Sequence, residues 1–164
     1  MGRMEEAKKT KSRKKVKDQL PSKIRGYKPI QALNSGAMGS LWLCRDPSLD
    51  RLVVAKRLHS NLNNQELYIK RFLQEGSILA HLNHPSIIQP YALWKDSDGN
   101  YTMSMEYVQG SSLKDLLSKN KRPPIWVVET MLYELLSALS HAHRNGVTHR
   151  DLKPANMMID KDGR

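Results

Sequence analysis

The stretch HRDLKPANMMIDKDGR, residues 149–164, places an acid, bases and an amide within a few positions of one another. Asp151 can accept a proton from a hydroxyl, Lys153 can neutralise phosphate charge, and Asn156 offers an uncharged oxygen to a metal ion. Pro154 fixes a bend between the lysine and the amide. The spacing Asp-x-Lys-x-x-Asn therefore indicates a phosphoryl-transfer constellation.

The segment before this stretch, residues 123–146, has the pattern of one long helix. Pro124 stands near its start and Gly146 at its end, as helix termini prefer. His141 and His143 are two positions apart and do not share a helix face, which argues against a histidine metal site. An apolar stripe at helical spacing comprises Ile125, Val128, Leu132, Leu135, Leu136 and Leu139.

The preceding part of the chain predicts a sheet with one helix. Short apolar stretches separated by turn residues indicate five strands, at 27–33, 40–44, 51–58, 87–94 and 101–108. The first three form an antiparallel meander, and DSDGN (96–100) is a hairpin signal between the last two. Residues 63–83 predict a helix and 111–120 a short one. The fold class is therefore α+β, with a boundary near Gly110.

Two features of the predicted sheet are candidates for binding a ligand. Gly36 and Gly39 lie between two strands and leave room for phosphate oxygens against backbone N–H groups, although a hairpin without a ligand fits equally well. Lys56 ends an apolar strand, where an inward charge needs a partner or a ligand. Glu75 is one candidate partner, and the alternative is two ordinary surface charges.

The composition limits the class of protein. No apolar run approaches the roughly 18 residues that a membrane helix requires. The N-terminus has no secretory signal, and Glu6 stands where N-myristoylation requires Ser or Thr. The single cysteine, Cys44, excludes an internal disulfide framework, fits a reducing cytoplasmic compartment, and is expected to be a small buried residue.

Most of the net charge of +11 comes from residues 1–25, which carry ten Lys or Arg residues and three acidic ones, a balance of +7. Such a tail is expected to be a disordered, solvated extension. It could also contact anionic lipid, nucleic acid or an acidic partner through long-range attraction, but nucleic acid is not the expected main partner.

From about Tyr27 to its end, the sequence resembles the eukaryotic-type (Hanks-type) serine/threonine protein kinases, particularly those of bacteria. The matching motifs are NSGAMGSLW (34–42) for the glycine-rich loop, VVAK (53–56) for the strand with the ATP-phosphate lysine, FLQEGSILAHLNHPSII (72–88) for the αC helix, MEYVQGSSL (105–113) for the hinge and HRDLKPAN (149–156) for the catalytic loop. Five motifs in family order make the resemblance specific.

The resemblance implies a role for each matching residue. Asp151 would accept the proton of the substrate hydroxyl, Lys153 would stabilise the transferring phosphoryl group, and Asn156 would hold one Mg²⁺. Arg150 and Lys153 argue against the small-molecule phosphotransferases that share the fold. The positions implied in ATP binding are Gly36, Gly39, Leu41, Val54, Lys56, Glu75, Met105, Glu106 and Val108.

The chain departs from the family pattern at three places. Asn34 replaces the first loop glycine, and its tolerance of positive φ predicts a stiffer loop that still works. Val54 stands where a smaller Ala usually roofs the adenine pocket. The sequence also stops before the family's Asp-Phe-Gly motif, so MMID (157–160) is expected to lack a strand partner and the apolar stripe of 123–146 to be exposed.

These observations predict a protein-kinase-like fold in three parts: a basic tail (1–25), the N-terminal lobe and hinge (26–109) and a partial C-terminal lobe (110–164). The expected function is that of a serine/threonine protein kinase using ATP and Mg²⁺, with little transfer by this chain alone. The alternative is a non-catalytic half-kinase that binds nucleotide or a partner.

Overall fold

The computed structural model describes Pro21, residues 24–118, residues 123–161 and Gly163. Most of the predicted basic tail (1–25) lies outside these residues. The described chain forms two compact units. The first comprises Pro21, 24–76 and 90–107, and the second comprises 77–89, 108–118, 123–161 and Gly163.

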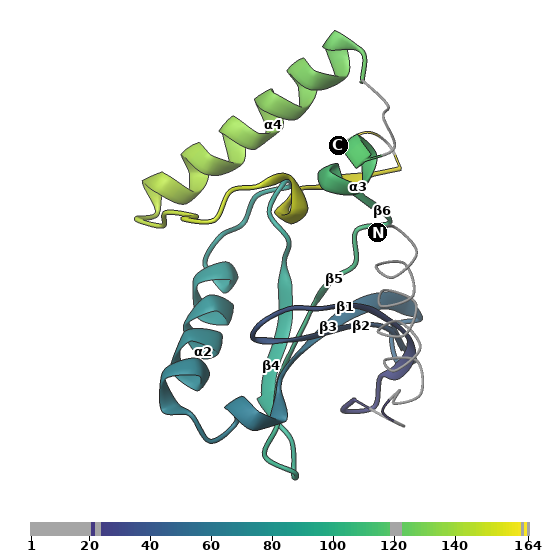
Figure 1. Cartoon of the computed structure of the whole chain (residues 1–164), viewed down its shortest axis with the longest axis vertical. Coiled ribbons are helices and arrows are strands. Elements are labelled where there is room, and N and C mark those ends of the chain that lie inside the picture. Colours follow the sequence, from purple (N-terminus) through teal and green to yellow (C-terminus); the bar gives the residue numbers. More distant parts are fainter. Residues whose placement is uncertain (1–20, 22–23, 119–122, 162, 164) are drawn as a thin grey trace, which may run out of the picture. The chain divides into compact units, whose positions relative to one another are not determined.

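The first unit is built on a five-stranded antiparallel sheet, which confirms the predicted fold class (Figure 1). Its strands are β1 (Lys28–Ser35), β2 (Gly39–Asp46), β3 (Arg51–Leu58), β4 (Pro90–Lys95) and β5 (Tyr101–Glu106), in the order β1-β2-β3-β5-β4. β4 begins later than the predicted residue 87, because the Ile87 N–H donates to the His84 carbonyl and closes a turn there.

One face of the sheet is covered by the segment that leads into β1. Successive side chains of a strand point to opposite faces, so Val53 and Ala55 share this face. They form a buried cluster with Ile24, Trp42 and Cys44. Cys44 is fully buried, as predicted, and burial raises the pKa of its thiol to about 11. The thiol is therefore protonated at neutral pH.

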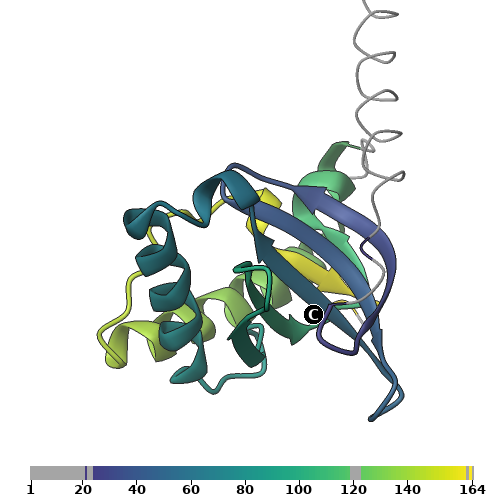
Figure 2. The same cartoon turned by 90° about the horizontal axis from the view of Figure 1, so that it is seen from below.

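Helix α2 (Glu66–Ala80) lies on the other side of the sheet (Figure 2). Phe72 is fully buried and is the largest such side chain among the described residues. Gly76 allows a close approach, because a Cβ there would stand 2.6 Å from Leu93 Cδ1 on β4. A 3-10 turn, η1 (Ser60–Leu62), precedes the helix. The helix is shorter than the predicted 63–83, because turn bonds flank it at both ends: the Gln65 N–H donates to the Leu62 carbonyl, and the His81 N–H donates to the Ile78 carbonyl.

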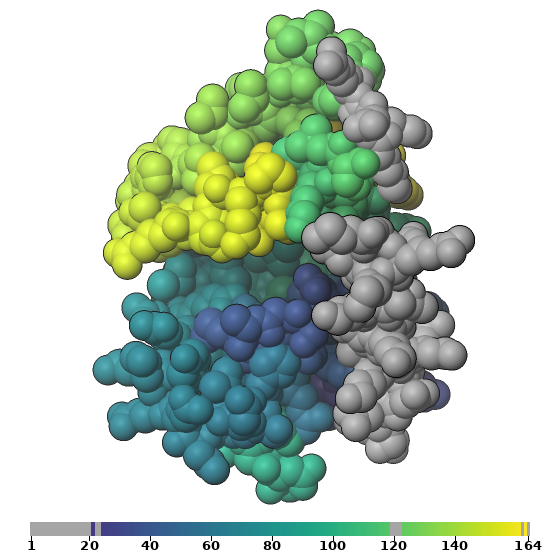
Figure 3. Space-filling model, viewed as in Figure 1, coloured from purple at the N-terminus to yellow at the C-terminus, as the bar shows by residue number. Residues whose placement is uncertain are grey.

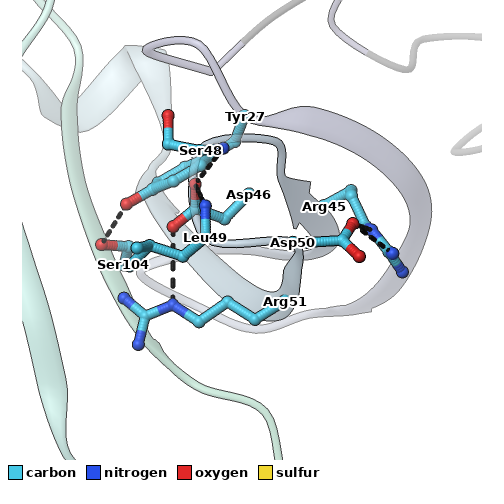
Figure 4. Close-up of polar contacts among 8 residues, drawn as sticks. All are labelled: Tyr27, Arg45, Asp46, Ser48, Leu49, Asp50, Arg51 and Ser104. Atoms are coloured by element: carbon cyan, nitrogen blue, oxygen red, sulfur yellow. Dashed lines mark hydrogen bonds and ion pairs between the residues drawn. The ribbon is translucent and has the colours of Figure 1, made fainter.

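The turn between β2 and β3 is held by a buried carboxylate (Figure 4). Asp46, only 5% exposed, accepts hydrogen bonds from the Ser48 and Leu49 amides at 3.0 and 3.4 Å and from Arg51 Nε at 3.5 Å. Arg45 pairs with Asp50 on the outer side of the same turn. These contacts fix the point at which β3 enters the sheet.

A further ion pair joins β3 to the turn between β4 and β5. Arg57 Nη2 lies 2.7 Å from Asp96 Oδ2, and the Asn100 amide donates to Asp96 Oδ1 at 2.8 Å. Burial of the Asp96 carboxyl raises its pKa, but the hydrogen bonds from Asn100 and the nearby Arg57 charge outweigh that effect. The pKa of Asp96 is therefore lower in the folded chain than its ordinary value.

We expect Asp96→Asn to lower the melting temperature at neutral pH. The depressed pKa gives stability that is present above the unfolded-state pKa of about 3.9 and is lost as the pH falls through the folded-state value. A partly exposed pair of this kind contributes about 0.5 to 1 kcal/mol. Thermal melts from pH 7 to 3 should show the difference between the two proteins shrinking as the pH falls below about 3.9, while Asp98→Asn, at an exposed neighbour, should follow the wild type. A difference that keeps the same size over this whole range would contradict this account.

The second unit contains a small sheet that corrects one sequence-based expectation. The prediction that residues 157–160 lack a strand partner is wrong, because β7 (Met158–Asp160) pairs antiparallel with β6 (Gly110–Ser112). Gly110 permits this pairing, since a Cβ at that position would collide with the Ile159 carbonyl oxygen. Helix α3 (Leu113–Ser118) follows β6 directly, and η2 (Pro154–Asn156) precedes β7.

Helix α4 (Ile125–Arg144) is the long element of the second unit. It begins after Pro124 and ends before Gly146, which has φ +72°, as the sequence predicts. Of its apolar stripe, Ile125, Leu132 and Leu136 are exposed, in line with expectation. None of the helices in the described ranges is long and apolar enough to cross a membrane.

The segment that follows α2 contacts α4 through side-chain hydrogen bonds. Ser137 Oγ lies 3.0 Å from His84 Nε2, and Ser86 Oγ donates to Glu134 at 2.5 Å. The His84 and His141 rings are 5.5 Å apart. These contacts join two segments that are distant in the sequence.

Candidate functional site

The glycine-rich connection between β1 and β2 is a tight turn with one open position. The Gly36 N–H donates to the Gly39 carbonyl at 2.9 Å. A Cβ on Gly39 would collide with the Arg57 carbonyl of β3, so this glycine is required for packing. A Cβ on Gly36 would meet nothing closer than 4.0 Å, which leaves the space that a phosphate group needs.

Asn34 does not use the conformational freedom that the sequence suggested. It belongs to β1 opposite Leu41 and is not among the described residues with positive φ. Its side-chain oxygen instead accepts a hydrogen bond from the Ser35 N–H at 2.8 Å. This local bond stiffens the start of the turn without a left-handed residue.

Lys56 and Glu75 are brought together across the interior of the first unit. Lys56 Nζ lies 2.5 and 2.7 Å from the two oxygens of the Glu75 carboxylate. The side chains are 22% and 39% exposed, so the pair is partly shielded from water. The Phe72 ring lies 5.9 Å from the same Nζ. The pair therefore holds the ammonium group at a fixed place on the α2 side of β3.

The apolar positions assigned to nucleotide binding lie on the same face of the sheet as Lys56. Leu41 is opposite Lys56 in the β2–β3 ladder, and Val54 is opposite Met105 in the β3–β5 ladder. Val54 and Met105 are each 9% exposed. Glu106 ends β5 in the first unit, and Val108 belongs to the second unit.

The loop of residues 149–156 lies at the surface of the second unit (Figure 3). Lys153 Nζ donates to both oxygens of Asp151, at 2.9 and 2.7 Å. Asn156 Nδ2 donates to the Asp151 carbonyl at 2.9 Å and to its carboxylate at 3.0 Å. Arg150 has φ +60°, a sharp reversal that precedes the carboxylate. The three predicted residues thus form one cluster.

These contacts set the protonation of Asp151 and leave one ligand atom free. The hydrogen bonds from Lys153 and then Asn156 hold the pKa of Asp151 below its ordinary value, so the carboxylate is ionised at neutral pH. Because the Asn156 amide nitrogen donates to Asp151, its Oδ1 faces elsewhere and accepts no hydrogen bond from any residue in the described ranges. A free amide oxygen is a ligand that Mg²⁺ accepts, so these residues fit the ion.

The sequence analysis missed His59, which contacts the glycine-rich turn. His59 Nε2 lies 2.8 Å from the Gly36 carbonyl oxygen of the glycine-rich turn. The two residues are 23 positions apart, and no local pattern marks the contact. Only the hairpin register, which places the end of β3 beside Gly39, could have indicated it.

The comparisons with known proteins identify the family. The sequence model described as "Protein kinase domain" matches residues 27–164, and the chain belongs to this family. It is 35% identical over 139 residues to the serine/threonine-protein kinase PrkC of Bacillus subtilis, covering 84% of this chain and 21% of that protein. It is 38% identical over 145 residues to the serine/threonine-protein kinase pkn3 of Myxococcus xanthus, covering 87% of this chain and 26% of that protein.

The solved structures give the same fold. The kinase domain of PknI from Mycobacterium tuberculosis superposes with a TM-score of 0.71 at 27% identity, covering 87% of this chain and 59% of that one. The chain thus spans about a fifth to a quarter of these two curated relatives and less than two thirds of the solved kinase domain.

Proposed function

We propose that the protein to which this chain belongs transfers the γ-phosphoryl group of ATP to Ser or Thr hydroxyls of a protein. The observation that carries the proposal is the cluster in which Lys153 and Asn156 both donate to Asp151. It combines an ionised carboxylate, a cation and a free amide oxygen, which are the groups that phosphoryl transfer uses. The names of the relatives, serine/threonine-protein kinases, support the choice of acceptor.

In the first unit, the proposed role is to bind the nucleotide. Gly36 and Gly39 would present backbone amides to the phosphates. Lys56, held by Glu75, would place its charge against the α and β phosphates. The apolar residues Leu41, Val54 and Met105 would contact the adenine, and the backbone of Glu106 would bind its polar edge.

In the second unit, the proposed role is to direct the acceptor and the transferred group. Because Asp151 is ionised, it can accept a hydrogen bond from a substrate hydroxyl and orient its oxygen for attack. Lys153 would neutralise charge on the moving phosphoryl group, and Asn156 Oδ1 would hold Mg²⁺. The ion would supply further neutralisation of phosphate charge.

Three further proposals concern the chain as a whole. We propose that residues 26–109 act as the nucleotide-binding lobe and 110–164 as part of the substrate lobe. We propose a cytoplasmic location, where ATP and reduced Cys44 are both expected. The basic tail would bind an anionic partner by long-range attraction, so deleting residues 1–25 should remove any salt-sensitive binding of the chain to anionic surfaces.

The proposal is tested first by the binding of Mg-ATP to the purified chain. Ligand at about 100 times its dissociation constant adds about 2.7 kcal/mol to stability, which should raise the melting temperature by about 5 to 10 °C. Mg²⁺ without nucleotide is the control. No shift at millimolar Mg-ATP would contradict nucleotide binding by this chain. A shift without transfer of labelled phosphate to a generic protein substrate would favour the non-catalytic alternative for the chain alone.

A further inference from the structure

His59 joins the end of β3 to the glycine-rich turn by two hydrogen bonds. Its backbone N–H donates to the Met38 carbonyl at 3.0 Å, and its Nε2 lies 2.8 Å from the Gly36 carbonyl oxygen. Both partners belong to the short connection between β1 and β2. One residue therefore contacts this connection from its backbone and from its side chain.

The chemistry of the acceptor fixes the direction of the side-chain bond. A carbonyl oxygen only accepts, so His59 Nε2 carries the hydrogen and donates it to Gly36. The imidazole is mounted on a defined backbone, since His59 has φ −61° and ψ 139° and its carbonyl accepts the Leu62 N–H at 2.9 Å. The turn is thus tied to a residue that is itself held by β3 and η1.

This tether determines where the next amide of the turn points. In a planar trans peptide, the carbonyl and the following N–H point in opposite directions. Because the Gly36 carbonyl faces His59, the Ala37 N–H faces away from it. Within the part of the chain that the structure describes, the Ala37 and Met38 amides donate to no other residue. They are free donors on an ordered turn, which is what an anion such as phosphate requires.

We propose that His59 is a positioning residue for the nucleotide phosphates, which acts by holding the glycine-rich turn with the Ala37 N–H turned outward. The inference rests on the proposed nucleotide site and adds to it a residue outside the glycine-rich motif. Without the Nε2 bond, the Gly36–Ala37 peptide is free to rotate. Part of the free energy of ligand binding must then be used to order this peptide. Affinity for phosphates should fall while affinity for the nucleoside should not.

Substitutions at His59 can separate the bond from the bulk of the side chain. In His59→Gln, the amide nitrogen is the same number of bonds from Cα as Nε2, so a donor can reach Gly36. In His59→Asn, the amide nitrogen corresponds to Nδ1 and falls short. His59→Ala removes the donor altogether. His81→Ala is the matched control, because His81 Nδ1 also contacts a backbone carbonyl, that of Ser77, but this carbonyl belongs to α2 and not to the turn.

Calorimetric titration of the full 164-residue chain with Mg-ADP and with adenosine gives the decisive comparison. We expect His59→Ala and His59→Asn to bind Mg-ADP roughly three- to tenfold more weakly, a range of up to about 1.4 kcal/mol. Adenosine should bind as in the wild type, His59→Gln should recover most of the loss, and His81→Ala should show none. If His59 only supported folding, its replacement would lower the affinity for Mg-ADP and for adenosine together.

The possible results distinguish this inference from the proposed function. If the wild type binds neither ligand, the nucleotide site is wrong and the role of His59 falls with it. If the wild type binds both ligands and the ratio of the two affinities is the same in His59→Ala, His59→Asn and wild type, the nucleotide site stands and the role of His59 is refuted. The role of His59 would also be refuted if His59→Gln and His59→Asn lost the same affinity for Mg-ADP, because a donor that reaches Gly36 would then make no difference.

Discussion

Replacing Lys56 with Met is expected to remove at least about half of the rise in melting temperature that Mg-ATP gives the wild-type chain. Lys56 carries the cation that Glu75 fixes on the α2 side of β3, at 2.5 and 2.7 Å. Methionine keeps the apolar stem but removes the charge and its donors. A hydrogen bond from a charged group contributes about 1.5 to 3 kcal/mol, so Mg-ATP affinity should fall about 10- to 100-fold.

The matched control for this prediction is Lys70→Met. Lys70 is exposed on α2, in the same unit, and its replacement by Met removes the same positive charge. It should keep the wild-type response to Mg-ATP, which excludes a general effect of lost positive charge on an anionic ligand. Melting without nucleotide shows whether each variant folds. Lys56→Met that folds and still shifts like the wild type would mean that the nucleotide lies elsewhere.

The Lys56–Glu75 pair was predictable because both residues carry local signals. β3 is an apolar strand whose side chains point alternately to two covered faces of the sheet. A charge at Lys56 therefore needs a partner inside the unit. Glu75 lies on the apolar-striped helix that covers that face. The sheet and its antiparallel order follow from strand patterns and short turns in the same way.

Three features escaped prediction because they depend on contacts between distant residues. β6 and β7 are three residues each, too short for an alternating pattern, and they pair although they lie far apart in the sequence. The His59–Gly36 bond joins residues that no motif connects. The burial of Gly76 against Leu93 likewise depends on how α2 lies on β4. Such contacts follow from packing, which sequence periodicity does not encode.

The largest loss of stability is expected from Phe72→Ala. Phe72 is the only phenylalanine of the chain and is fully buried between α2 and the sheet. Truncating a buried Phe to Ala typically costs about 3 to 5 kcal/mol, against a total stability of about 5 to 15 kcal/mol for a domain. Urea unfolding followed by tryptophan fluorescence should show this loss. Leu73→Ala, at the neighbouring but exposed position, should stay within about 0.5 kcal/mol of wild type.

The same position also links the core to the nucleotide site. The cavity left by Phe72→Ala would open beside Lys56 Nζ, which lies 5.9 Å from the ring, so more water could reach the partly exposed Lys56–Glu75 pair and weaken it. We therefore expect the response to Mg-ATP to fall together with stability in Phe72→Ala and in no exposed variant of α2. Because the chain has one phenylalanine, fluorophenylalanine labelling gives a single ¹⁹F resonance. A resonance in the native wild type at the denatured position would show that Phe72 is not buried.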